Sequence, residues 1–211
     1  MNNLNTILAL SPHTDDVELG AGGMIAKWIE EGKQVFYVAL STARKSVSEG
    51  LPVDILEKEV KQATKVLGIG EENLYIYNFE ARVFSQFRQD ILDLLISLRE
   101  QLKPGLVLLP SLKDTHQDHI TVVEEGLRAF KHITILSYEL PWNLLGFAPS
   151  LFVTLQREHL NKKIQAVNCY QSQKHKKYTG EEFLYGWARM RGGQINCDYA
   201  EAFEIIRWII R

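Results

Sequence analysis

Short apolar runs alternate along most of the chain with segments in which apolar side chains recur at helical spacing. The first apolar run spans residues 4–10, a helical pattern covers 22–31, and a second apolar run covers 34–40. Strands that alternate with helices of this length are typical of crossover units, in which consecutive strands run parallel. The pattern therefore predicts an α/β fold: a Rossmann-like three-layer sandwich with a largely parallel central sheet and helices on both faces.

The alternation continues into the second half of the chain. Further helices are predicted at 53–67, 87–102, 121–130, 158–170 and 181–190, and further strands at 73–77, 106–109, 133–136 and 151–155. The apolar C-terminal run 203–210 is interrupted by charge, which favours a core or edge strand over a membrane anchor. The stretches 41–52, 141–150 and 171–180 are predicted to be long loops, and such loops often cover active sites.

Two polar clusters follow directly after predicted strands. One comes after the strand at 4–10 and the other after the strand at 106–109. Because ligands of open parallel sheets bind at the carboxyl ends of the strands, where loops converge, we expect the two clusters to share one site. Together they hold three imidazoles and three carboxylates: His13, Asp15, Asp16, His116, Asp118 and His119.

These side chains suit a divalent metal ion. Catalytic zinc usually takes three protein ligands and leaves a position for water, and His13, Asp16 and His119 meet that requirement. Asp15 would then be free to take a proton from the water. Zinc is the expected ion, although histidine and carboxylate ligands also accept Fe²⁺ or another divalent metal.

His116, three residues before His119, is expected beside the carbonyl oxygen of the substrate as an electrophilic or acidic partner. Asp118 is expected to hold the His116 ring in orientation and to favour its imidazolium form, which suits stabilisation of an oxyanion. A simpler interpretation of the first cluster is that Asp15 or Asp16 caps the following helix.

Composition limits the remaining possibilities. The 211 residues, 45% of them hydrophobic and 24% charged, predict one globular domain over 1–211. A net charge of -2 argues against a nucleic-acid partner, and the basic run 174–177 is expected to be a solvated loop. Cys169 and Cys197 form no disulfide framework, and the N-terminus lacks the features of a secretory signal. We therefore expect a cytoplasmic protein without an integral membrane segment, and the sequence leaves open whether it forms a homo-oligomer.

The motifs resemble those of the PIG-L/LmbE-like deacetylases. Residues 13–23, HTDDVELGAGG, resemble the first signature of that family, with Thr14 where proline is commonest and Ala21 where cysteine often sits, and residues 116–119, HQDH, resemble the second. Softer similarities lie at 59–68, at 163–173 and at 199–203. The resemblance implies a zinc-dependent enzyme that removes acetyl groups from N-acetylglucosamine-type amino sugars, so the expected partner is a small N-acetylated sugar.

The resemblance also implies roles for single residues. His13, Asp16 and His119 correspond to zinc ligands and Asp15 to the general base. The residue that stabilises the tetrahedral intermediate corresponds to His116, oriented by Asp118. One position departs from the family pattern, because Leu56 stands where many members have an arginine. Three arginines are candidates to replace that contact: Arg44, Arg82 and Arg88.

Three alternatives stay open on the sequence alone. A metallohydrolase acting on another amide or an ester would use the same water activation. A metal-containing sugar-binding protein without catalysis would keep the ligands, although it has no evident need for Asp15. A nucleotide-binding Rossmann protein rests only on the glycines at 20–23 and on the sheet pattern, and these glycines lack the spacing of the dinucleotide fingerprint.

Overall fold

The computed structural model describes residues 4–210, and within that range seven strands form one sheet in the order β3-β2-β1-β4-β5-β7-β6. Strands β1 to β5 pair in parallel, whereas β7 runs antiparallel to both β5 and β6. The largely parallel sheet expected from the sequence is confirmed. The strands are β1 (Thr6–His13), β2 (Gln34–Ser41), β3 (Leu74–Ile76), β4 (Leu106–Pro110), β5 (Thr134–Tyr138), β6 (Leu151–Leu155) and β7 (Tyr199–Arg207).

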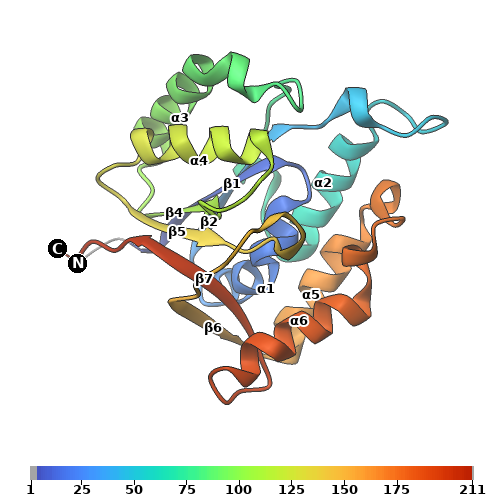
Figure 1. Ribbon diagram of the computed structural model, residues 1–211, viewed down its shortest axis with the longest axis vertical. Coiled ribbons are helices and arrows are strands. Elements are labelled where there is room, and N and C mark those ends of the chain that lie inside the picture. The colour runs from blue at the N-terminus through green and yellow to red at the C-terminus, as the bar shows by residue number, and fades with distance from the viewer. Residues whose placement is uncertain (1–3, 211) are drawn as a thin grey trace.

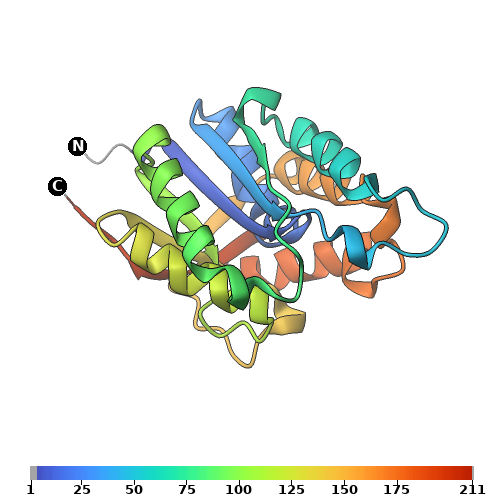
Figure 2. The ribbon, with the colours of Figure 1, turned by 90° about the horizontal axis from the view of Figure 1, so that it is seen from above.

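Helices cover both faces of this sheet. The described helices are α1 (Asp16–Glu30), α2 (Ile55–Leu67), α3 (Arg88–Leu102), α4 (Gln117–Ala129), α5 (Arg157–Asn168) and α6 (Glu181–Gly193). Helices α3 and α4 lie on one side of the strands, and the other four lie on the opposite side (Figures 1 and 2). Successive side chains of a strand point to opposite faces, so Ile7 packs with α1 and α5 while Leu8 packs with α3 and α4. Both faces are buried, which is why β1 is apolar without alternation.

Helices α1 and α4 begin earlier than the apolar pattern indicates. Helix α1 starts at Asp16 rather than near residue 22, and α4 starts at Gln117 rather than near residue 121. The first turns carry buried polar residues, among them Glu18 and His119, and these interrupt the apolar periodicity. Asp16 and His119 therefore lie in the first turns of helices, and not in loops as the sequence analysis expected.

The predicted long loops at 41–52 and 171–180 lie on the right of Figure 1, and the one at 141–150 follows the carboxyl end of β5. The apolar run near the C-terminus contributes to β7, which has a neighbouring strand on each side. Among the described residues, none of the helices has the length and apolar character needed to span a bilayer. Cys169 and Cys197 are both free thiols.

Candidate metal centre

Two imidazole rings and one carboxylate converge at the carboxyl end of β1. His13 is the last residue of β1, Asp16 is the first residue of α1, and His119 lies in the first turn of α4. The Nδ1 atom of His13 lies 3.2 Å from Nε2 of His119. Asp16 Oδ2 lies 3.3 Å from that Nδ1 and 3.2 Å from that Nε2. Donor atoms bound at about 2.0–2.2 Å to one ion stand roughly 3 to 3.5 Å apart, so this triangle fits a divalent cation.

A buried carboxylate holds the far nitrogen of each ring. Asp114 Oδ2 lies 2.8 Å from Nδ1 of His119, and Asp118 Oδ2 lies 3.0 Å from Nε2 of His13. Such partners select the ring tautomer that offers a lone pair to the metal. Asp118 was expected to orient His116; its carboxylate lies on His13, and its contact with the His116 ring is made by the backbone N–H, 3.2 Å from Nδ1. Asp114 was not predicted as a functional residue, since nothing in its spacing from His119 marks the contact.

Asp118 also ties a neighbouring loop to the centre. Its carboxylate accepts the backbone N–H of Arg82 at 2.5 Å and that of Phe84 at 3.1 Å. Arg82 adopts a φ of 72°, in the left-handed region that favours glycine. The backbone at 82–84 is thus arranged around a side chain that supports the candidate ligand His13.

The pKa values of all three donor groups are shifted from their ordinary values. Burial opposes protonation of His119, but the charge of Asp16 and the hydrogen bond to Asp114 raise the pKa of His119 to about 10. Burial likewise opposes protonation of His13, and hydrogen bonds to Asp118 and Asp16 raise its pKa above the ordinary value. The charge of His119 holds the pKa of Asp16 well below its usual range despite burial. A metal ion would therefore displace protons from the imidazoles.

His116 is the N-cap residue of α4, and its Nδ1 accepts the backbone N–H of Asp118 at 3.2 Å. Burial and the positive charges of His119 and His13 lower the pKa of His116 to about 4. The nearby charge of Asp118 acts in the expected direction but is outweighed. At neutral pH the ring is therefore neutral, with its proton on Nε2, and not the imidazolium that the sequence analysis expected.

Asp15 stands next to the triangle without belonging to it. It occupies the N-cap position of α1 but makes no capping hydrogen bond through its side chain, so the simple helix-cap interpretation does not describe it. Its Oδ2 lies 3.6 Å from Nζ of Lys176. Burial alone would lower the pKa of Lys176, but the charge of Asp15 raises it. Asp15 is therefore a carboxylate outside the triangle of candidate donor atoms, and it is paired with a lysine.

A network of buried hydrogen bonds fixes the turn that carries Asp15. The hydroxyls of Tyr37 and Tyr170 both donate to the carbonyl oxygen of Thr14, the first at 2.9 Å. The same hydroxyls contact the carboxyl group of Glu18 at 2.5 and 2.7 Å, and burial raises the pKa of Glu18 to about 8. This turn is therefore held from below by side chains of β2 and of the segment after α5.

The triangle lies in the wall of a cavity of about 340 Å³. All three predicted long loops contribute to its walls, as the sequence analysis expected for loops that cover a site. Their lining residues are Ala43, Ser46, Ser48, Trp142, Asn143, Gln173, His175, Lys176 and Tyr178. The rings of Trp142 and Tyr178 stack face to face, with centroids 3.8 Å apart. Asp15 and His116 line the same cavity, so the two sequence clusters do form one site.

Comparison with known proteins places this site in a family. A family model described as PIG-L, GlcNAc-PI de-N-acetylase, matches residues 8–130, more than half of the chain and both polar motifs. The chain belongs to the PIG-L family. Assignment to this family agrees with the resemblance found in the sequence motifs.

Two relatives of this PIG-L protein match over most of its length. The uncharacterized deacetylase YaiS of Escherichia coli K12 is 28% identical over 176 residues, which cover 81% of this chain and 93% of YaiS. The diacetylchitobiose deacetylase of Thermococcus kodakarensis is 26% identical over 195 residues, which cover 82% of this chain and 71% of that enzyme. Both relatives support a hydrolase of the deacetylase type.

Solved structures share the fold. The N,N'-diacetylchitobiose deacetylase of Pyrococcus horikoshii superposes with a TM-score of 0.80 at 22% identity, covering 97% of this chain and 84% of that one. GalB, the 4-carboxy-2-hydroxymuconate hydratase of Pseudomonas putida, superposes with a TM-score of 0.78 at 22% identity, covering 98% of each chain. Because this fold serves a deacetylase and a hydratase, the reaction has to be argued from the site.

The structure separates the three arginines proposed to replace the arginine missing at position 56. Arg44 pairs with Glu57 at 3.2 Å, and Arg88 pairs with Glu125 at 2.6 Å. Neither borders the cavity, whereas Arg82 does, as does Leu56 itself. Arg82 is therefore the one of the three that a substrate in this cavity would meet.

The glycines after the first motif serve packing. A Cβ on Gly20 would stand 2.4 Å from the ring of Tyr138, and one on Gly23 would stand 2.5 Å from Leu155. Both glycines lie inside α1, where they let the helix approach the sheet closely. This close contact accounts for them without a bound nucleotide.

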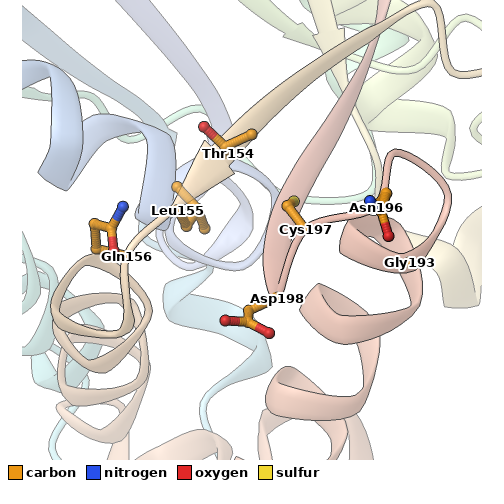
Figure 3. A pocket seen from close by; sticks show the side chains of 7 residues that line it. All are labelled: Thr154, Leu155, Gln156, Gly193, Asn196, Cys197 and Asp198. Carbon is orange, nitrogen blue, oxygen red and sulfur yellow. The ribbon is translucent and has the colours of Figure 1, made fainter.

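A second cavity, of about 450 Å³, lies between the end of β6 and the segment before β7 (Figure 3). Its lining residues are Thr154, Leu155, Gln156, Gly193, Asn196, Cys197 and Asp198. It holds a single carboxylate and no imidazole among these residues. Although this cavity is the larger, its side chains offer no cluster of metal ligands, so the candidate site is the cavity at the carboxyl end of β1.

Proposed function

We propose that this PIG-L protein is a metal-dependent hydrolase that removes the N-acetyl group from an N-acetylated amino sugar and releases acetate. One observation carries the proposal: the carboxylate of Asp15 lines the same cavity as the triangle of donor atoms without belonging to that triangle. A site that only bound a metal and a sugar would not need that carboxylate. The deacetylases among the relatives support the same reaction class.

The candidate ligands His13, Asp16 and His119 fit zinc, and they also accept Fe²⁺ or another divalent ion. An ion held there would polarise the acetyl carbonyl and make a water molecule more acidic. Asp15 accepts a proton from the water as the water oxygen bonds to the carbonyl carbon.

The Nε2–H of His116 donates a hydrogen bond to the carbonyl oxygen as negative charge develops there. A neutral ring with its proton on Nε2 can make that donation, and the Asp118 N–H on Nδ1 favours this tautomer. When the C–N bond breaks, the proton held by Asp15 passes to the leaving nitrogen. The products are a free amine and acetic acid, which ionises to acetate and releases the second proton of the water, and Asp15 returns to its starting charge.

The cavity suits a sugar in size and chemistry. Its volume of about 340 Å³ lies within the range of small-molecule sites. Trp142 and Tyr178, stacked on each other, add aromatic surface to the lining, and sugar rings present apolar C–H groups to aromatic side chains.

The test is an acetate-release assay of the metal-reconstituted protein with free, nucleotide-linked and lipid-linked N-acetyl sugars. We expect release from at least one of these classes. Asp15→Asn should bind metal as the wild type does and lose nearly all turnover, whereas Asp198→Asn, in the second cavity, should behave like the wild type. Full activity of Asp15→Asn would refute the assignment of the base. Bound metal with no acetate from any class would favour a non-catalytic sugar-binding protein or a hydrolase of another amide or ester.

A further inference from the structure

The basic run 174–177, expected to be a solvated loop, sends one of its lysines into the site. Lys174 and Lys177 are exposed, whereas Lys176 is half-buried and lines the cavity. Its ammonium lies 3.6 Å from Asp15 Oδ2 and 5.6 Å from the ring centre of Tyr178. The other two lysines of the run make neither contact. Position 176 is therefore distinguished by the fold and not by the composition of the run.

Contacts on both sides of Lys176 anchor the backbone that carries it. Upstream, Glu59 accepts the backbone N–H of Ser172 at 2.9 Å and its hydroxyl at 2.6 Å. Downstream, Tyr178 stacks on Trp142. Between them the backbone N–H of Lys176 donates to Gln173, and its carbonyl accepts from the residue at 179. The segment is anchored at each end, so the contact between Lys176 and Asp15 is a built feature of the cavity.

The contact matters because Asp15 and Asp16 are adjacent carboxylates with different roles. Asp16 is held by the backbone N–H of His13 at 2.8 Å and faces both ligand rings. For the Asp15 side chain, the ammonium of Lys176 is the one polar contact found among residues 4–210. A divalent cation would attract both carboxylates. A base bound to the metal has fewer lone pairs free for a proton, so Asp15 needs a neighbouring group that keeps it from becoming a fourth ligand.

We propose that Lys176 is the positioning residue that keeps Asp15 out of the metal coordination and aimed at the water. The inference rests on the proposed function, in which Asp15 is the base. An ammonium beside Asp15 offsets part of the attraction of the metal for that carboxylate. It also holds the carboxylate on the cavity side of the 13–16 turn, while Tyr37 and Tyr170 hold the Thr14 carbonyl below. Without the ammonium, Asp15 would be free to turn toward an ion held by His13, Asp16 and His119.

The experiment compares Lys176→Met, which keeps the length of the side chain and removes its charge, with Lys176→Arg, which keeps the charge. Lys174→Met and Lys177→Met are matched controls from the same run. Each protein is loaded with Co²⁺, whose visible absorption weakens as its coordination number rises. Thermal denaturation of each variant checks that it is folded.

We expect Lys176→Met to show weaker Co²⁺ absorption than the wild type and a kcat reduced about ten- to a hundredfold, with KM changed less than about threefold, because a misplaced base costs turnover more than binding. Lys176→Arg should restore most of the absorption and of kcat. The double variant Asp15→Asn/Lys176→Met should regain the wild-type spectrum, because the carboxylate that joined the metal is gone. Both control variants should match the wild type.

An unchanged Co²⁺ spectrum in folded Lys176→Met overturns the proposal, as does a weakened spectrum that persists in the double variant. The spectra need no substrate, so they decide the role of Lys176 even if no acetyl sugar is hydrolysed. Absence of acetate release from the wild type would instead refute the proposed function. The two failures are therefore distinguishable.

Discussion

Replacing Asp114 by Asn tests whether the buried carboxylates select the ring tautomers of the candidate ligands. Asp114 is buried, its Oδ1 accepts the backbone N–H of His116 at 2.8 Å, and its Oδ2 lies 2.8 Å from Nδ1 of His119. If the Asn oxygen stays on the His116 N–H, its NH₂ group faces Nδ1 of His119. That Nδ1 must then accept a hydrogen bond, and the ring proton moves to Nε2, the atom that should bind metal.

If the amide turns over instead, its NH₂ group faces the backbone N–H of His116, and that half-buried donor loses its acceptor. Either orientation has a cost. Loss of such a supporting carboxylate typically weakens metal binding about 10- to 100-fold. This corresponds to about 1.4–2.8 kcal/mol of binding free energy. In the metal-free protein Asp114 also raises the pKa of His119, so the variant suffers less competition from protons. The deficit should therefore be larger at pH 9 than at pH 7.

The assay is competition for Zn²⁺ between the metal-free protein and a chromophoric chelator at both pH values. Asp198→Asn controls for the change of charge, and His119→Ala defines the loss of a ligand. A Zn²⁺ affinity of Asp114→Asn within about threefold of the wild type at both pH values, with binding abolished in His119→Ala, would refute the tautomer argument.

Three further predictions follow from other contacts. The pKa of His119 is about 10 in the folded protein, against an ordinary 6.5. The stability that protonated His119 adds to the metal-free protein is therefore full below pH 6.5 and is lost as pH rises toward 10. In urea unfolding the free energy of unfolding should fall by about 1.4 kcal/mol per pH unit over this range, and His119→Gln should remove the decline. Arg82→Gly should unfold no more easily than the wild type, because glycine relieves the strained φ. The same variant should raise KM several-fold if the arginine contacts the substrate in the cavity, and an unchanged KM would exclude that contact. Lys163→Met should lower the free energy of unfolding, measured by chemical denaturation, by about 3–5 kcal/mol. The reason is that buried Glu201, which lies 2.6 Å from Lys163 Nζ, would lose its counter-ion. A change below about 1 kcal/mol would contradict this.

Much of the architecture follows from the sequence pattern alone. An apolar run such as 34–40 is typical of a strand buried on two faces, and helical spacing such as that at 53–67 is typical of a helix buried on one face. Each pattern can be recognised from residues that are close together in the sequence. The strands at 34–40 and 151–155 and the helices at 53–67 and 87–102 agree closely with β2, β6, α2 and α3. The starts of α1 and α4 were missed, since polar residues buried for chemistry do not follow the apolar period.

The chemical types in the candidate site were also determined by the sequence, because imidazole and carboxylate side chains after two parallel strands point to a metal whichever atoms finally meet. Only the tertiary structure decided which atoms those are. It placed the carboxylate of Asp118 on His13 and its backbone N–H on His116, assigned Asp114 to His119, and brought Lys176 to Asp15 across 161 positions of the chain. Such pairings depend on where strands, turns and loops come together in space. A hydrogen bond requires a donor–acceptor distance defined to within an ångström, and the spacing of residues along the sequence does not determine such distances.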